Sequence, residues 1–173
     1  MLRKLAAVAA LLVLAACATV PPNPLTATSR QAMYVKDVQT AWNLEAKGNP
    51  KPKTDEEKAK LEENNGKLDA RLKAAVTDAF ATSPAGSEPV TFKINIKQAN
   101  PGFLGSVTAD VSVIRISDGA ELGVYKGVMG ADTSGANGGL LGIAIAAAMK
   151  PDSIGIMSNN FATALRARFD AVK

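Results

Sequence analysis

Alternating apolar and polar residues predict four strands, beginning with two whose patterns differ in quality. From Val90 to Ile96 every second residue is apolar and the residues between them are polar. A period of two with one apolar side predicts a strand with one buried and one solvated face. Met33–Trp42 is also rich in β-branched and aromatic residues, and Tyr34, Val38 and Trp42 share one parity. We expect it to be a strand as well, with an imperfect pattern.

The next two predicted strands form a hairpin. Val107–Ile116 alternates up to Val113 and then changes sides, which predicts a bulge or burial of both faces at that end. Asp118-Gly119 follows and predicts a two-residue turn. The return strand is Glu121–Met129, with apolar side chains on one face and two glycines on the other. The apolar residues are Leu122, Val124 and Val128, and the glycines are Gly123 and Gly127. These glycines indicate a weak edge or the close approach of another backbone.

Two segments have the spacing of amphipathic helices. Thr54-Asp55-Glu56-Glu57 fits a capping box that opens the first helix. Asn64-Asn65-Gly66 contains poor helix formers and predicts a kink there or a frayed first half. Pro151 and a capping Asp152 precede the second helix. The apolar stripes that we expect to face the core are Leu61, Leu68, Leu72, Val76 and Phe80 in the first helix, and Met157, Phe161, Leu165 and Phe169 in the second.

The order of these elements is strand, helix, three strands, helix. It predicts an α+β fold of two layers, in which two helices cover one face of a mainly antiparallel sheet of about four strands.

The N-terminus has a different pattern. Arg3 and Lys4 precede an apolar run from Leu5 to Leu14, and small residues then lead to Cys17. This is the layout of a secretory signal peptide. A short transmembrane anchor is the alternative, although a spanning helix needs about 20 apolar residues and this run is shorter. Residues 18–30 contain three prolines and no apolar periodicity, so we expect an extended tether there.

Composition narrows the possible chemistry. The 173 residues carry a net charge of +4, which falls to +2 without Arg3 and Lys4, so nucleic-acid binding is not expected. The chain has no histidine and only one cysteine. Histidine triads, cysteine–histidine dyads and histidine-ligated metals are therefore excluded. We expect no catalytic residues, no metal site and no cofactor.

A glycine-rich apolar segment is the most unusual part of the second half. Its glycines form two overlapping pairs four residues apart, a spacing that lets helix backbones approach closely. One hypothesis is a contact segment for self-association or for a membrane, and the alternative is a short buried helix. The residues of this possible contact segment are Gly135, Gly138, Gly139, Leu140, Leu141, Gly142, Ile143 and Ile145.

The string Leu14-Ala15-Ala16-Cys17 resembles the lipobox of bacterial lipoproteins. With the hairpin Ile116–Gly123, the glycine-rich segment and Asn160–Leu165, the chain resembles small, uncharacterised lipoproteins of Gram-negative bacteria. The resemblance implies a signal peptide over residues 1–16, lipidation of Cys17, a tether over residues 17–30, and one periplasmic domain over residues 31–173.

The residues after Cys17 also imply a location. Ala18 and Thr19 are not the aspartate that resembles an inner-membrane retention signal, which implies the periplasmic face of the outer membrane. The expected function is a non-enzymatic envelope interaction or assembly module, anchored to the membrane by lipid and bound to an envelope protein. Homo-oligomerisation stays open. A small-ligand or lipid carrier is the alternative, and an enzyme is less expected.

Overall fold

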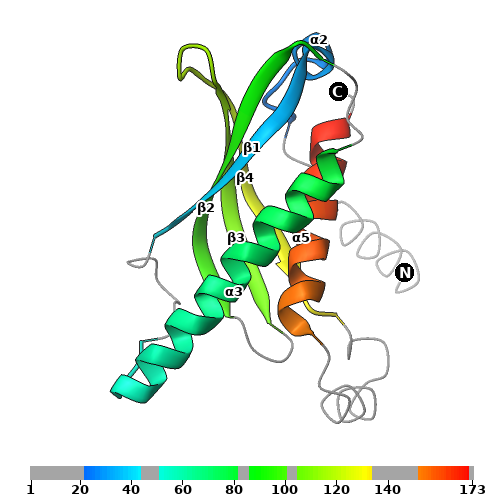
Figure 1. Cartoon of the computed structure of the whole chain (residues 1–173). Coiled ribbons are helices and arrows are strands. Elements are labelled where there is room, and N and C mark those ends of the chain that lie inside the picture. The colour runs from blue at the N-terminus through cyan, green and yellow to red at the C-terminus, as the bar shows by residue number, and fades with distance from the viewer. Residues whose placement is uncertain (1–21, 44–50, 82–85, 101–104, 134–151, 172–173) are drawn as a thin grey trace, which may run out of the picture.

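Four strands and two long helices form two layers in the computed structural model, which describes residues 22–43, 51–81, 86–100, 105–133 and 152–171. The sheet order is β1-β2-β3-β4, with β1 parallel to β2 and the other neighbours antiparallel. Helices α3 and α5 cover one face (Figure 1). The predicted α+β fold is confirmed, and the short helix α2 is an addition. The elements are α2 (Ala27–Ala32), β1 (Met33–Trp42), α3 (Asp55–Phe80), β2 (Glu88–Asn100), β3 (Ser106–Arg115), β4 (Glu121–Ala131) and α5 (Ser153–Asp170).

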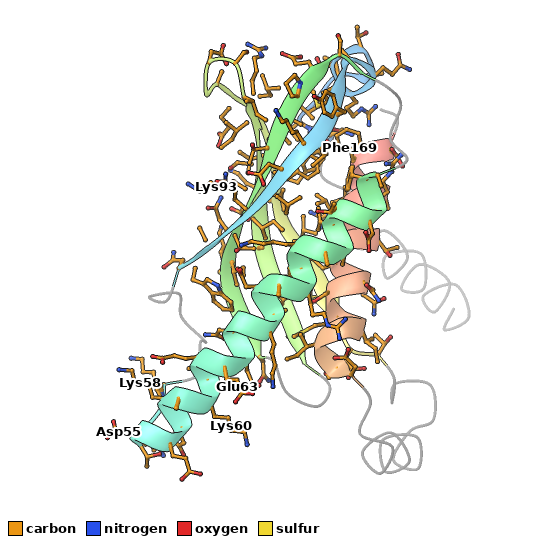
Figure 2. All side chains as sticks on the ribbon, in the orientation of Figure 1. Asp55, Lys58, Lys60, Glu63, Lys93 and Phe169 are labelled. Atoms are coloured by element: carbon orange, nitrogen blue, oxygen red, sulfur yellow. The ribbon has the colours of Figure 1, made fainter. Side chains whose placement is uncertain are left out.

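Helix α3 begins as the sequence predicts. The Thr54 hydroxyl accepts a hydrogen bond from Glu57 N–H at 3.1 Å. The helix then runs through Asn64-Asn65-Gly66 without interruption, so neither the predicted kink nor the fraying is observed. From Leu68 onward its apolar stripe is buried against the sheet, which stabilises that half. The first half is mostly exposed and extends beyond the sheet, with charged side chains pointing into solvent (Figure 2).

A bulge in β1 corrects the predicted facing of this strand. Val35 pairs with Val90, and Val38 pairs with Phe92, so the register shifts by one residue between them. Because of this shift, Met33 and Val38 are both buried, whereas Tyr34 is exposed. Tyr34 and Val38 therefore do not share a face, because one inserted residue inverts the alternation.

Strand β4 departs from a simple alternation for the same reason. Gly127 has a φ of 60°, and the register shifts at this point. The buried side chains are consequently Tyr125 and Val128, not the predicted set with Leu122 and Val124. The hairpin before β4 is also longer than predicted, since Arg115 N–H donates to Ala120 O and closes a loop that contains Asp118-Gly119.

The space between the two layers is filled by apolar side chains. All four predicted stripe residues of α5 are buried, as are Leu68, Leu72, Val76 and Phe80 of α3. Phe80 packs edge-on against Phe92 and Phe169, with ring centroids 4.9 and 5.2 Å apart. Within the described ranges, none of the helices is both long and apolar enough to span a membrane.

Candidate functional site

The segment that leads into the domain is folded onto it from Pro22 onward. Asn23 is only 6% exposed. Its amide nitrogen donates to the carbonyl oxygens of Arg168, Phe169 and Ala171 at 2.9, 3.0 and 3.2 Å. Arg168 and Phe169 belong to the last turn of α5 and Ala171 is its C-cap, and carbonyls at a helix C-terminus have no partner within the helix. The expectation of an extended tether up to Arg30 is therefore wrong for residues 22–30.

Arg30 completes this attachment from the last turn of α2. Its guanidinium donates to Phe169 O and, at 2.7 Å, to Ala171 O. A cation at the C-terminal end of a helix is favoured by the partial negative charge there. We call Asn23, Arg30 and the C-terminal carbonyls of α5 the N-terminal clamp. It joins residues that are more than one hundred positions apart in the sequence.

Tyr125 links the clamp to the sheet. Its hydroxyl donates to Asn23 Oδ1 at 3.0 Å, and Leu25 N–H donates to the same oxygen at 3.1 Å. Burial raises the pKa of Tyr125, and the charge of Arg30 and the bond to Asn23 offset this only in part. The phenol is thus held in its neutral, donating form. Beside it lies a groove of about 180 Å³, lined by Pro22, Asn23, Pro24, Val124, Tyr125, Lys126 and Arg168.

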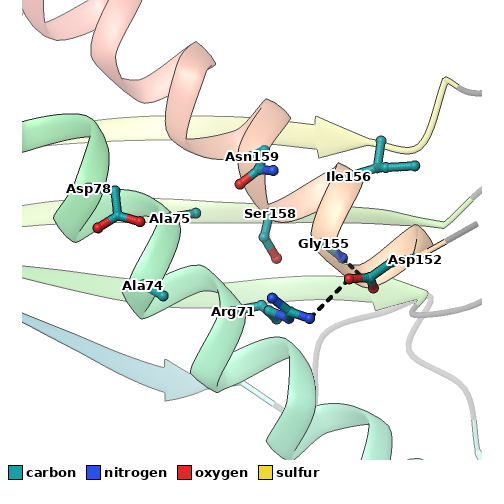
Figure 3. Close-up of a pocket in the computed structure, with 9 residues that line it drawn as sticks. All are labelled: Arg71, Ala74, Ala75, Asp78, Asp152, Gly155, Ile156, Ser158 and Asn159. Carbon is teal, nitrogen blue, oxygen red and sulfur yellow. Dashed lines mark hydrogen bonds and ion pairs between the residues drawn. The ribbon is translucent and has the colours of Figure 1, made fainter.

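A second groove of about 310 Å³ lies between α3 and α5 (Figure 3). Arg71 Nη2 is 3.1 Å from Asp152 Oδ2, and both side chains are well exposed. Asp152 Oδ1 also accepts from Gly155 N–H at 2.9 Å and caps α5. The Ser158 hydroxyl donates to Ile154 O at 2.7 Å. Asp152 and Ser158 are thus bonded to the backbone of α5. What remains is a small charged depression beside Ala74 and Ala75.

The sequence-predicted site residues lie outside the part of the chain that the structure describes. This holds for Cys17 and for the whole possible contact segment, Gly135, Gly138, Gly139, Leu140, Leu141, Gly142, Ile143 and Ile145. The described residues that flank the contact segment are Thr133, just after β4, and Asp152, at the start of α5. Both lie at the opposite end of α5 from the N-terminal clamp. Metal-ligating side chains do not gather in groups of three anywhere in the described ranges.

Sequence reasoning missed the N-terminal clamp. Asn23 and Arg30 stand among prolines and small residues, where apolar residues repeat neither every second position, as in a strand, nor every 3.6 positions, as in a helix. The available signal was Thr26 followed by Ser29, since the Thr26 hydroxyl accepts from Ser29 N–H at 3.1 Å and caps α2. A helix of six residues is too short for this signal to stand out.

The two edges of the sheet differ in how they are covered. At β4, Arg168 donates to the carbonyls of Lys126 and Gly127 at 2.7 and 3.2 Å, and Asn160 donates to Ala131 O at 2.7 Å. At β1, in the described part of the chain, the backbone pairs on one side only, with β2. Such an edge presents unpaired backbone groups to a further strand, although the bulge and the charges of Lys36 and Asp37 restrict pairing in its first half.

Comparison with known proteins adds little to this picture. No protein-family model matches the chain, and no curated protein resembles it significantly. Among solved structures it is similar to a Caulobacter crescentus CB15 protein named a "putative lipoprotein". The two are 13% identical, the match covers 76% of this chain and 86% of the other, and the TM-score is 0.34.

Proposed function

We propose that this protein is a lipid-anchored periplasmic domain of the outer membrane that binds another envelope component without catalysing a reaction. The observation that carries the proposal is the string Leu14-Ala15-Ala16-Cys17 after a charged and apolar leader. Two or more acyl chains on Cys17 would hold the protein firmly, because each buried CH₂ contributes about 0.8 kcal/mol.

The edge of β1 is the surface that we propose for the partner. The described strands pair with β1 on one side only, whereas at β4 Arg168 and Asn160 donate hydrogen bonds to the carbonyls of Lys126, Gly127 and Ala131. An extended segment of a partner would add to Val38–Trp42, beyond the bulge, through main-chain hydrogen bonds. The Thr40 hydroxyl donates to Asp69 of α3, and Trp42 packs against the core, so this half of the strand is firmly positioned.

The carrier alternative is less well supported. A carrier of an apolar ligand needs a pocket of several hundred Å³ enclosed by apolar side chains. Phe80, Phe92, Tyr125 and Phe169 instead fill the space between the layers in the described part of the domain. The groove between α3 and α5 lies on the outside of the helical layer and carries charged side chains.

The experiment has two parts, one for the anchor and one for the partner. Intact mass of the membrane-extracted protein should show acyl chains on Cys17, and a Cys17→Ser variant should appear in the soluble periplasmic fraction. A photo-crosslinking residue at Gln39 on β1 should then yield one discrete heterologous product in cells. The matched control is the same residue at Thr108, on β3 within the sheet. An unmodified Cys17 would refute the anchor, and equal products from both positions would refute the β1 edge.

A further inference from the structure

The chain between Cys17 and Pro22 limits how far the domain can lie from an acyl anchor. Each residue of an extended chain spans at most about 3.3–3.6 Å, so the five steps from Cys17 to Pro22 reach at most about 18 Å. From Asn23 onward the chain is held by the N-terminal clamp. A lipid on Cys17 would therefore leave little freedom, and the end of the domain nearest Pro22 would lie against the membrane.

Contacts of the N-terminal segment identify this end. The groove beside Pro22 and Pro24 is formed by Val124–Lys126 of β4. A Cβ atom added to Gly123 would lie 3.1 Å from side-chain atoms of both Pro24 and Leu25. Tyr125 pairs with Val111 in the middle of β3, and Gly123 pairs with Val113 closer to the hairpin. The chain therefore meets the domain beside the middle of β4 and runs from Pro22 to Leu25 toward the β3–β4 hairpin. The strands β1 and β2 also begin at this end of the sheet, because Met33 pairs with Glu88 and Val90 with Arg115.

This end carries two of the large hydrophobic side chains that are exposed in the described part of the chain. Tyr34 is 37% exposed and Ile116 is 41% exposed. Pro89 lies between them, since it pairs with Tyr34 and its carbonyl accepts from Ile116 N–H at 3.2 Å. The three residues form an apolar tip across β1, β2 and the hairpin. The third large hydrophobic residue, Met129, is 57% exposed and lies toward the other end of β4.

One basic side chain beside the apolar tip is paired with two acidic side chains. Arg115 Nε lies 2.5 Å from Glu88 Oε1, and Arg115 Nη1 lies 3.1 Å from Asp118 Oδ2. Lys36 and Asp37 are adjacent on β1. These five residues carry two positive and three negative charges, so they give no attraction to anionic lipid, and any contact with a bilayer would depend on the apolar and aromatic groups. Tyrosine is enriched where protein meets the membrane interface.

We propose that the apolar tip of Tyr34, Pro89 and Ile116 docks on the phospholipid surface that holds the lipid of Cys17, and so fixes the orientation of the domain. This inference rests on the proposed lipidation. The open edge of β1 and the far end of the sheet then face away from the bilayer. Docking through apolar groups should also be insensitive to salt.

Site-specific labelling tests the orientation directly. Acylation of Cys17 occupies the only native thiol, so Ser117→Cys gives a single labelling site beside Ile116, and Gln98→Cys gives one near the far end of β2. The lipidated proteins are reconstituted into phosphatidylcholine vesicles that contain brominated phosphatidylcholine. We expect strong quenching of a fluorophore at position 117 and little at position 98. Quenching at 117 should persist at ~1 M salt, where the Debye length is about 3 Å.

Substitutions separate docking from mere tethering. Tyr34→Ser with Ile116→Ser should remove the excess quenching at position 117, whereas Met129→Ser should leave it unchanged. All three positions are exposed, so the fold should tolerate the changes, which far-UV circular dichroism checks. Equal quenching at positions 117 and 98, or loss of quenching in high salt, would overturn the docking while acyl chains on Cys17 still upheld the anchor. Absence of acyl chains would overturn both.

Discussion

Replacement of Asn23 by alanine should destabilise the domain more than its place near the chain terminus suggests. The side chain is 6% exposed and makes five hydrogen bonds. Two of the α5 carbonyls that it contacts keep Arg30 as a donor. The Leu25 N–H and the Tyr125 hydroxyl would lose Asn23 Oδ1, their shared acceptor. A buried donor without an acceptor costs about 1–3 kcal/mol, so we expect a loss of about 2–4 kcal/mol in the free energy of unfolding.

The measurement is urea unfolding of the mature chain with Cys17→Ser, followed by tryptophan fluorescence and circular dichroism. A double-mutant cycle with Tyr125→Phe isolates the shared bond. Tyr125→Phe alone should cost about 1 kcal/mol, because it removes one hydrogen bond and leaves the Asn23 oxygen with Leu25. In the Asn23→Ala background the same change should be neutral or stabilising, because it removes an unsatisfied hydroxyl. Strictly additive effects would refute this account of the N-terminal clamp.

Three further predictions concern backbone contacts and pH. Gly130→Ala should lower the free energy of unfolding by about 1–3 kcal/mol, because the added Cβ would lie 2.1 Å from Met157 O. The matched change Gly66→Ala should raise it by ~0.4–1 kcal/mol, because no atom lies within 4 Å of the added Cβ. Equal urea midpoints for the two variants would contradict both predictions. Because burial raises the pKa of Tyr125, the folded state keeps a proton that the unfolded state releases near pH 10. The free energy of unfolding should therefore fall above about pH 10, and Tyr125→Phe should reduce this fall. Burial of Asp110 opposes its ionisation, but the bonds from Lys97 and Gly127 N–H outweigh this and lower its pKa. The stability that the ionised Asp110 contributes is therefore present above about pH 4 and is lost on acidification. In Asp110→Asn the free energy of unfolding should fall less steeply with decreasing pH than in the parent protein.

The pattern of apolar residues was sufficient to predict that two helices pack on one face of a sheet. Every second residue from Val90 to Ile96 faces the helices, and the stripes of α3 and α5 are buried from Leu68 and Met157 onward. These predictions succeed because burial of one face imposes a strict period on the sequence. The hairpin signal at Asp118-Gly119 predicted that β3 and β4 are neighbours, whereas the parallel pairing of β1 with β2 was not predicted.

Bulges and the N-terminal clamp were not predictable in the same way. The bulges at Lys36 and Gly127 invert the facing of every residue beyond them, although nothing in the local composition of β1 marks the inserted residue. Asn23 and Arg30 act on carbonyls at the other end of the chain, and such contacts leave no periodic trace. The end of β3 was predicted better. The switch from Val113 to Ile114 indicated either a bulge or burial of both faces, and the register does shift there.

The projecting half of α3 has a consequence for how the chain responds to cleavage. Residues before Leu68 are held by the helical backbone and by exposed pairs such as Glu63–Lys67, whereas those after it are packed in the core. Local fraying should therefore expose Asn64–Gly66 to proteases and to rapid hydrogen exchange without global unfolding. A cut there would leave two fragments that still share the β1–β2 ladder, the N-terminal clamp and the bond between Thr40 and Asp69. The two fragments should therefore stay associated in the folded state, and separately produced fragments should reassemble on mixing.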